Sequence, residues 1–275
     1  METELGKLLE KDSIKMIANK IDLKIIEQIA HKAGDAIMEI YKGEFTIEMK
    51  GNNSPLTEAD KISNKIILQE LNLYFPEIPY ISEETKTIDY TERKEWPYCW
   101  LIDPIDGTKE FIKKNGEFTV NIALIENGKP TLGVVYAPAL NKMWSAKANV
   151  GCFSTNEKGE RNQLLKGISY KSLSKVRVIG SRSHMNTETE IFIQQLKNEG
   201  KEIDFVSAGS SIKFCLLAEG SADVYPRYAP TMEWDTAAGQ AVLEIAGGVV
   251  NEIGTTQPLL YNKENLLNPY FLCSW

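Results

Sequence analysis

Residues 100–108 read WLIDPIDGT, and this stretch decides which kind of fold the chain adopts. Its first three residues are apolar, which is typical of a strand that is buried on both faces. Asp103 and Asp106 follow at the end of that strand, and Gly107 and Thr108 then turn the chain. The stretch therefore predicts a buried strand that delivers acidic side chains to the edge of a sheet.

Two carboxylates this close to an apolar strand repel each other unless a cation lies between them. A metal ion supplies that charge, and the carbonyl oxygen of Ile105 is a ligand of the kind that Mg²⁺ accepts. Gly107 and Thr108 offer backbone amides at the expected start of a helix, where a phosphate group binds. The alternative is that Asp103 and Asp106 only cap a turn.

Three more acidic residues belong to the same hypothesis. Residues 81–84 read ISEE, and a neighbouring parallel strand would set Glu83 beside Asp103. Asp235 opens an expected helix, and Asp60 follows Thr57 by three residues. Each has a structural alternative that stays open here: a solvated loop for Glu83, and helix capping for the two aspartates.

The chain before residue 100 predicts two helices. Apolar residues at three- and four-residue steps favour one over 23–40, ended by Gly43, and another from Thr57 to Pro76. Strands are expected over 79–82, 98–102, 118–125 and 131–136, the last two joined at Asn127 and Gly128, and then over 143–145. An antiparallel meander should therefore follow the two helices.

The segment 151–171 is polar and is expected to be irregular, so the domain boundary is placed there. We expect an N-terminal α+β domain over 1–155 with most of the metal ligands, and a C-terminal α/β domain over 156–275 with Asp235. The second domain should alternate strands at 176–179, 203–206 and 224–226 with helices at 188–198, 211–219 and 234–246.

Composition bounds the function. The 275 residues are 43% apolar and 25% charged, as in globular proteins, and the formal net charge of -7 excludes a nucleic-acid polymer as a partner. The N-terminus does not resemble a signal peptide and no apolar run would span a bilayer, so we expect a cytoplasmic protein, with peripheral contact to the inner membrane left open. Four widely spaced cysteines predict neither disulfides nor a zinc ribbon.

The acidic motifs together resemble the inositol monophosphatase superfamily of lithium-sensitive, magnesium-dependent phosphatases. Further segments resemble its 3'(2'),5'-bisphosphate nucleotidases of bacteria: 106–112 (DGTKEFI), 115–123 (NGEFTVNIA), 209–215 (GSSIKFC) and 225–227 (YPR). The similarity covers nearly the whole chain beyond the first helix. It implies a layered α/β/α/β/α sandwich of the inositol monophosphatase and sugar phosphatase type, with the active site between its halves.

The resemblance also implies which residues hold metal. Glu83, Asp103 and the Ile105 carbonyl would bind one Mg²⁺ ion, and Asp103, Asp106 and Asp235 a second. A third, weaker ion would lie near Glu83.

Other residues are implied to handle water and substrate. Asp60 and Thr108, with Glu83, match the catalytic residues that position and help to deprotonate the attacking water. The substrate-binding set matches Glu83, Gly107, Thr108, His184, Ser210, Lys213, Arg227 and Asp235. A lone Lys and a lone Arg suit a second phosphate.

The resulting hypothesis is Mg²⁺-dependent hydrolysis of the 3'-phosphate of adenosine 3',5'-bisphosphate to AMP and phosphate, in sulfur assimilation. Its sulfated precursor, 3'-phosphoadenylyl sulfate, stays open as a second substrate, and the protein is expected to be a monomer or a homodimer. The alternatives are an inositol monophosphatase or sugar bisphosphatase on the same fold, and a module that senses the nucleotide without cleaving it.

Overall fold

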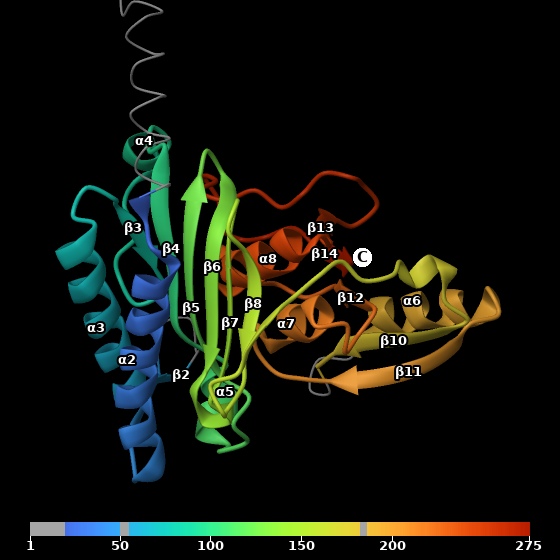
Figure 1. Ribbon diagram of the computed structural model, residues 1–275, viewed down its shortest axis with the longest axis horizontal. Coiled ribbons are helices and arrows are strands. Elements are labelled where there is room, and N and C mark those ends of the chain that lie inside the picture. The colour runs from blue at the N-terminus through green and yellow to red at the C-terminus, as the bar shows by residue number, and fades with distance from the viewer. Residues whose placement is uncertain (1–19, 50–54, 182–185) are drawn as a thin grey trace, which may run out of the picture.

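The computed structural model describes residues 20–49, 55–181 and 186–275, which form two β-sheets and the helices around them. Helices α2 and α3 cover one face of the large sheet, α7 and α8 lie between the two sheets, and α6 covers the far face of the small sheet (Figure 1). This is the predicted α/β/α/β/α layering.

The large sheet has seven strands in the order β3-β4-β5-β6-β7-β8-β9. β3 and β4 are parallel, and every later pair is antiparallel, which confirms the expected meander. Asn127 and Gly128 join β5 to β6 with φ angles of 50° and 77°, as a type I′ turn requires. The strands are β3 (Tyr80–Ser82), β4 (Tyr98–Asp106), β5 (Thr119–Glu126), β6 (Lys129–Ala137), β7 (Lys142–Lys147), β8 (Gly151–Thr155) and β9 (Arg161–Gln163).

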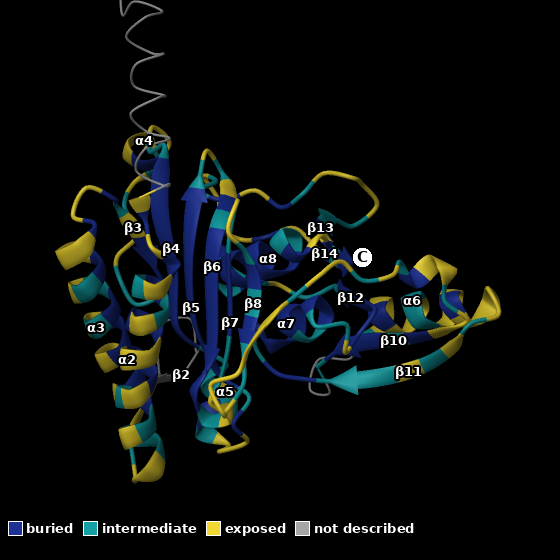
Figure 2. Cartoon of the chain, in the orientation of Figure 1, coloured by how far each residue is buried: buried dark blue, intermediate teal, exposed yellow. Residues whose placement is uncertain are grey.

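The two predicted N-terminal helices are α2 (Leu23–Lys42) and α3 (Glu58–Tyr74). The carboxylate of Asp22 caps α2, and Gly43 ends it by donating its amide to the carbonyl of Ile40 at 3.0 Å. Both helices bury apolar side chains against the large sheet and expose their opposite faces (Figure 2). Between them, β1 (Ile47–Met49) and β2 (Pro55–Thr57) form a separate two-stranded sheet.

The small sheet has five strands in the order β11-β10-β12-β14-β13. β10 (Lys175–Gly180), β11 (Glu202–Ser207) and β12 (Val224–Arg227) are parallel, as the alternation predicts, and α6 (Thr187–Asn198) and α7 (Ile212–Ala218) connect them. The antiparallel strands β13 (Val249–Glu252) and β14 (Phe271–Ser274) were not predicted.

Helix α8 (Glu233–Ala246) lies in the middle of the molecule and packs on β4 to β8. Gly133 on β6 lets it approach, because a Cβ there would lie 2.5 Å from the carbonyl oxygen of Ala238. The predicted irregularity of 151–171 is wrong for β8 and β9, which extend the large sheet, with β9 as its exposed edge. β9 belongs to the large sheet although it lies beyond residue 155. The division of the chain into two domains at 155/156 therefore stays a proposal.

The remaining short elements are α4 (Tyr90–Arg93), α5 (Thr108–Ile112) and the 3₁₀ turns η1 (Pro138–Leu140) and η2 (Tyr170–Ser172). All four cysteines are buried and free, as expected. No helix of the described ranges is long and apolar enough to cross a membrane.

Candidate active site

The parallel pair β3 and β4 brings two acidic segments to one edge of the large sheet. Ser82 lies opposite Ile102, and the amide of Glu83 donates to the carbonyl of Ile102 at 3.2 Å. The carboxyl groups of Glu83 and Asp103 are hydrogen-bonded to each other. The expectation that a parallel neighbour sets Glu83 beside Asp103 is thus confirmed.

A β-bulge lets Asp103 and Asp106 serve the same site. In a regular strand, residues three apart point to opposite faces. The pairing of β4 with β5 shifts register between Asp103 and Asp106, and such bulges re-aim side chains. Asp103 is buried, and it lies close enough to Asp106 for the charge of Asp106 to raise its pKa.

Asp60 combines helix capping with a place in the site. It is the third residue of α3, and its Oδ2 accepts from the amide and the hydroxyl of Thr57 at 2.7 and 2.6 Å. Its Oδ1 lies 3.3 Å from the hydroxyl oxygen of Thr108, which is also 3.3 Å from the carbonyl oxygen of Ile105. Asp60 therefore caps α3 and also lies beside Thr108, so the two descriptions do not exclude each other.

Asp235 reaches the same acidic group from α8, which lies between the two sheets. It is the third residue of α8, and its Oδ2 accepts from the amide of Met232 at 2.8 Å, so it also caps its helix. Burial and then the charge of Asp106 raise its pKa, while the Met232 amide and Arg227 oppose that rise. Helix α8 thus carries a carboxylate towards the end of β4.

Neighbouring carboxylates disfavour the charged forms of Asp103 and Asp235. Burial, followed by the charges of Glu83, Asp106 and Asp235, raises the pKa of Asp103 well above its usual range. A bound cation relieves this repulsion, and an all-oxygen donor set suits a hard ion such as Mg²⁺. Within residues 20–49, 55–181 and 186–275, no three His, Cys, Asp or Glu side chains meet closely enough to hold an ion as they stand. The chemistry of the donor set nevertheless fits Mg²⁺.

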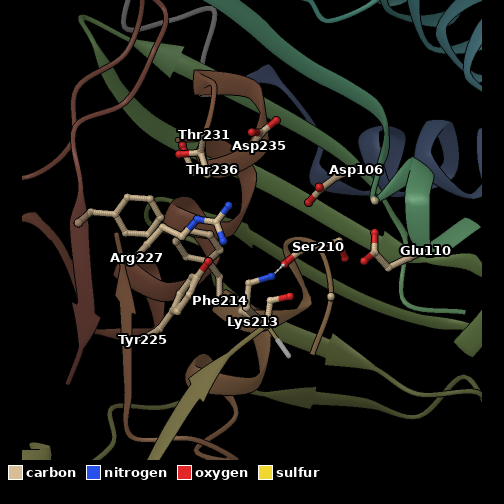
Figure 3. Close-up of a pocket in the computed structure, with 14 residues that line it drawn as sticks. Asp106, Glu110, Ser210, Lys213, Phe214, Tyr225, Arg227, Thr231, Asp235 and Thr236 are labelled. Atoms are coloured by element: carbon tan, nitrogen blue, oxygen red, sulfur yellow. Dashed lines mark hydrogen bonds between the residues drawn. The ribbon is translucent and has the colours of Figure 1, made fainter. Parts of the chain in front are cut away.

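A cavity of about 130 Å³ opens beside Asp106 and Asp235. Gly107, Ser210, Lys213 and Arg227 also line it. Figure 3 shows the carboxylates of Asp106 and Asp235 on one side, with the ends of the Lys213 and Arg227 side chains turned toward the same space. The cavity can therefore hold a ligand between acidic and basic groups.

Lys213 is a buried cation in this cavity. Its ammonium group donates to the carbonyl of Ser210 at 2.6 Å and lies 5.6 Å from the centre of the Tyr225 ring. Burial lowers its pKa to about 8, the charge of Asp106 opposes that effect, and Arg227 adds to it. An anionic ligand would favour the charged form of Lys213.

Two polar atoms of the cavity residues are buried and have no hydrogen-bond partner among the described residues: Oγ of Ser210 and Nε of Arg227. Such atoms are uncommon, because leaving them unpaired costs free energy. Ser210 also has a left-handed φ of 42°. The unpaired atoms and the strained backbone indicate a place for a polar ligand.

The predicted site residues divide into two groups, according to whether they line the cavity. Asp106, Gly107, Ser210, Lys213, Arg227 and Asp235 line the cavity. The second group does not line the cavity and is linked to the cavity residues by hydrogen bonds and charges around the end of β4. Its members are Asp60, Glu83, Asp103, Ile105 and Thr108. Gly107 has a φ of 90° and precedes α5, so the expected helix start is confirmed. His184 lies outside the described residues.

Three residues near the acids are not among the predicted site residues. Glu110 lines the cavity, Ser211 bonds to Asp106, and Asn121 bonds to Ser211. Glu110 is four residues after Asp106, in the motif 106–112, which is a signal that the sequence does contain. Asn121 lies within the motif 115–123, but only strand pairing brings β5, and Asn121 with it, next to the end of β4.

Sequence comparison shows which family the chain belongs to. The model of the inositol monophosphatase family matches residues 20–270. The 3'(2'),5'-bisphosphate nucleotidase CysQ of Escherichia coli is 46% identical over 250 residues, covering 90% of this chain and 97% of that protein. The CysQ of Buchnera aphidicola is 42% identical over 267 residues, covering 96% and 97%.

Solved structures agree with the fold. The crystal structure of CysQ from Bacteroides thetaiotaomicron, a bacterial member of the inositol monophosphatase family, has a TM-score of 0.80 at 41% identity and covers 92% of this chain and 96% of its own. The extragenic suppressor protein suhB from Bartonella henselae, at 22% identity, shares the fold with a TM-score of 0.72, covering 91% and 92%.

The chain belongs to the inositol monophosphatase family. Within that family, the relatives named above at 41–46% identity are CysQ proteins.

Proposed function

We propose that this chain is a Mg²⁺-dependent 3'(2'),5'-bisphosphate nucleotidase that hydrolyses the 3'-phosphate of adenosine 3',5'-bisphosphate to AMP and phosphate. The observation that carries the proposal is the cavity with Asp106 and Asp235 on one side and Lys213 and Arg227 on another. The names of its CysQ relatives support the same reaction.

The metal would be held by the acidic residues. Glu83, Asp103 and the Ile105 carbonyl are the proposed ligands of one Mg²⁺ ion, and Asp103, Asp106 and Asp235 of another, with a third ion near Glu83. When bound, Mg²⁺ would neutralise these carboxylates, make water more acidic and stabilise the charge on the leaving oxygen.

The residues around Asp60 would handle the attacking water. Asp60 would accept the proton, directed by Thr108, whose hydroxyl lies 3.3 Å from Oδ1 of Asp60, and Glu83 would help to orient the water. The amides of Gly107 and Thr108 would bind the 3'-phosphate that is hydrolysed. Because this pair lies next to the end of β4, the reacting phosphate would lie over the acidic residues.

The basic side of the cavity would hold the second phosphate. Lys213, Arg227 and the unpaired hydroxyl of Ser210 offer donors to it, and His184 is proposed to join them. An inositol monophosphate has no second phosphate and would leave these donors without a partner. The pair of cations therefore favours a bisphosphate over that alternative substrate.

Lithium sensitivity, a role in sulfur metabolism, action on 3'-phosphoadenylyl sulfate, a monomeric or dimeric state and a cytoplasmic location stay predictions. So does the division into 1–155, with most metal ligands, and 156–275, with the nucleotide contacts.

The test is phosphate release from adenosine 3',5'-bisphosphate, inositol monophosphate and fructose 1,6-bisphosphate, measured side by side with Mg²⁺ and with Mg²⁺ plus lithium. We expect the nucleotide to be strongly preferred and its hydrolysis to be inhibited by lithium. Preference for the inositol or sugar phosphate would refute the assigned substrate and leave the metal site standing. Tight nucleotide binding without phosphate release in Mg²⁺ would instead identify a sensing module.

A further inference from the structure

The hydroxyl of Ser211 joins two proposed metal-binding residues that come from opposite halves of the chain. Its Oγ lies 2.7 Å from Oδ2 of Asp106, at the end of β4, and 2.7 Å from the backbone carbonyl oxygen of Asp235, in α8. Ser211 is only 1% exposed, so water does not compete for these bonds. One buried hydroxyl thus spans the proposed ligand pair.

Asn121 fixes the direction of that hydroxyl. Its Nδ2 donates to Oγ of Ser211 at 2.8 Å, and its side chain is also buried, at 1% exposure. A serine hydroxyl has one hydrogen to donate. Since Asn121 can only donate through Nδ2, the single Ser211 hydrogen is left for the Asp106 carboxylate and the Asp235 carbonyl, which share it in a three-centre hydrogen bond.

This arrangement orients the Asp106 carboxylate. A bond to Oδ2 from a fixed donor sets the rotation of the carboxylate plane, and the rotation decides where Oδ1 points. Asn121 adds a longer contact of 3.5 Å from its Nδ2 to the same Oδ2. Residues that hydrogen-bond a metal ligand in this way orient it and raise metal affinity.

We propose that Ser211, held by Asn121, is a positioning residue that keeps Asp106 and Asp235 in register for the metal that they bind. The inference rests on the proposed function, because it concerns the same metal site. It also explains why the hydroxyl lies between the halves: Asp106 belongs to the large sheet, whereas Ser211 and Asp235 open α7 and α8.

The experiment measures binding of Mn²⁺ to the metal-free protein without substrate, by electron paramagnetic resonance. We expect Ser211→Ala to weaken Mn²⁺ affinity by about 10-fold or more, and Ser211→Thr, which keeps the hydroxyl, to restore most of it. Ser145→Ala is the matched control. Ser145 is also 1% exposed, and its hydroxyl donates to Oε1 of the Glu27 carboxylate at 2.5 Å, but this pair lies outside the proposed metal site. The Ser145→Ala protein should bind Mn²⁺ as the wild type does.

A second pair of variants tests the role of Asn121 and guards against a misfolded Ser211→Ala protein. Asn121→Ala should also weaken Mn²⁺ binding, and the loss in the double variant should be smaller than the sum of the two single losses, since Asn121 acts mainly through the hydroxyl and reaches Asp106 itself only at 3.5 Å. Additive losses, or an unchanged affinity in a folded Ser211→Ala protein, would overturn the inference. If Mn²⁺ fails to bind even the wild type, the proposed metal site is wrong, and that result is distinct from a failure of Ser211 alone.

Discussion

The hydroxyl oxygen of Thr108 lies 3.3 Å from Oδ1 of Asp60, although 48 residues separate them in the sequence. Thr57 holds the other oxygen of the same carboxylate through two hydrogen bonds. The helix cap therefore fixes Asp60 from behind, and Oδ1 is presented to Thr108. A structural motif at the start of α3 thus prepares a group for the proposed water-activating step.

Replacing Thr108 with Val removes this hydroxyl and keeps the shape of the side chain. We expect kcat to fall by about 100-fold, because proton transfer loses its oriented partner, while KM changes by less than about threefold. Steady-state kinetics with the nucleotide measures both. Thr108→Ser is the control that should retain most of the rate, and a Thr108→Val enzyme with wild-type kcat would contradict the role of the pair.

Asp103→Asn should abolish turnover and leave the protein folded. In the wild type, Oδ1 of Asp103 accepts from the amide of Ile105 at 3.1 Å, and asparagine keeps this acceptor oxygen. The substitution also removes a buried ionisable group whose charged form is disfavoured by Glu83, Asp106 and Asp235. Thermal unfolding in EDTA should therefore give a Tm equal to or above that of the wild type. Added Mg²⁺ should raise the Tm of the wild type only; a variant that is equally stabilised by Mg²⁺ would count against Asp103 as a ligand.

Lys213 should make substrate binding depend on pH. Burial lowers its pKa to about 8 in the free protein, so its charge is present below pH 8 and is lost above it. We expect kcat/KM for the nucleotide to fall by up to about 10-fold per pH unit above that value. Lys213→Met should raise KM by about 10-fold or more at pH 7, with a smaller change in kcat, and remove this limb of the pH profile. Equal slopes in both proteins would assign the limb to another group.

Glu244 should make the fold less stable at alkaline pH. Burial raises its pKa from 4.5 to about 7, against hydrogen bonds from Gln240 and the amide of Val250. Between these values the folded state holds a proton that the unfolded state has released, so the free energy of unfolding falls as pH rises. Glu244→Gln should therefore be about 1–2 kcal/mol more stable than the wild type at pH 8, after allowance for partial solvent screening, and similar at pH 4. Urea denaturation at both pH values measures this, and parallel changes in the two proteins would refute it.

Gly133→Ala should disturb the packing of α8. A Cβ at Gly133 would lie 2.5 Å from the carbonyl oxygen of Ala238 and 2.7 Å from Cβ of Ala241, and the backbone contact cannot be relieved by a rotamer change. We expect a loss of about 2–3 kcal/mol in the free energy of unfolding and weaker Mg²⁺ binding, since α8 carries Asp235. Gly43→Ala is the control: its Cβ would meet only Ile40 O at 3.6 Å, an ordinary contact. Equal stability of both variants would contradict the tight approach.

Local sequence patterns were sufficient for the parts of the fold that local physics dictates. The three- and four-residue apolar spacing predicted α2 and α3, and the Asn127–Gly128 turn predicted the β5–β6 hairpin. The acidic residues at strand ends and helix starts were also visible, because Asp and Glu are seldom placed beside an apolar strand without a reason. The pattern was weakest at β9 and β13, short strands whose residues carry little apolar alternation.

The sequence by itself thus determined the layered fold, the family and the set of acidic and basic residues. Only the tertiary structure decided how they meet: the bulge that re-aims Asp103 and Asp106, the register that sets Glu83 beside Asp103, and the hydroxyl of Ser211 between Asp106 and Asp235. The physical reason is that these contacts join residues up to 105 positions apart, as Ser211 and Asp106 are. Strand pairing and helix packing decide such distances, and neither is encoded in the local spacing of residue types.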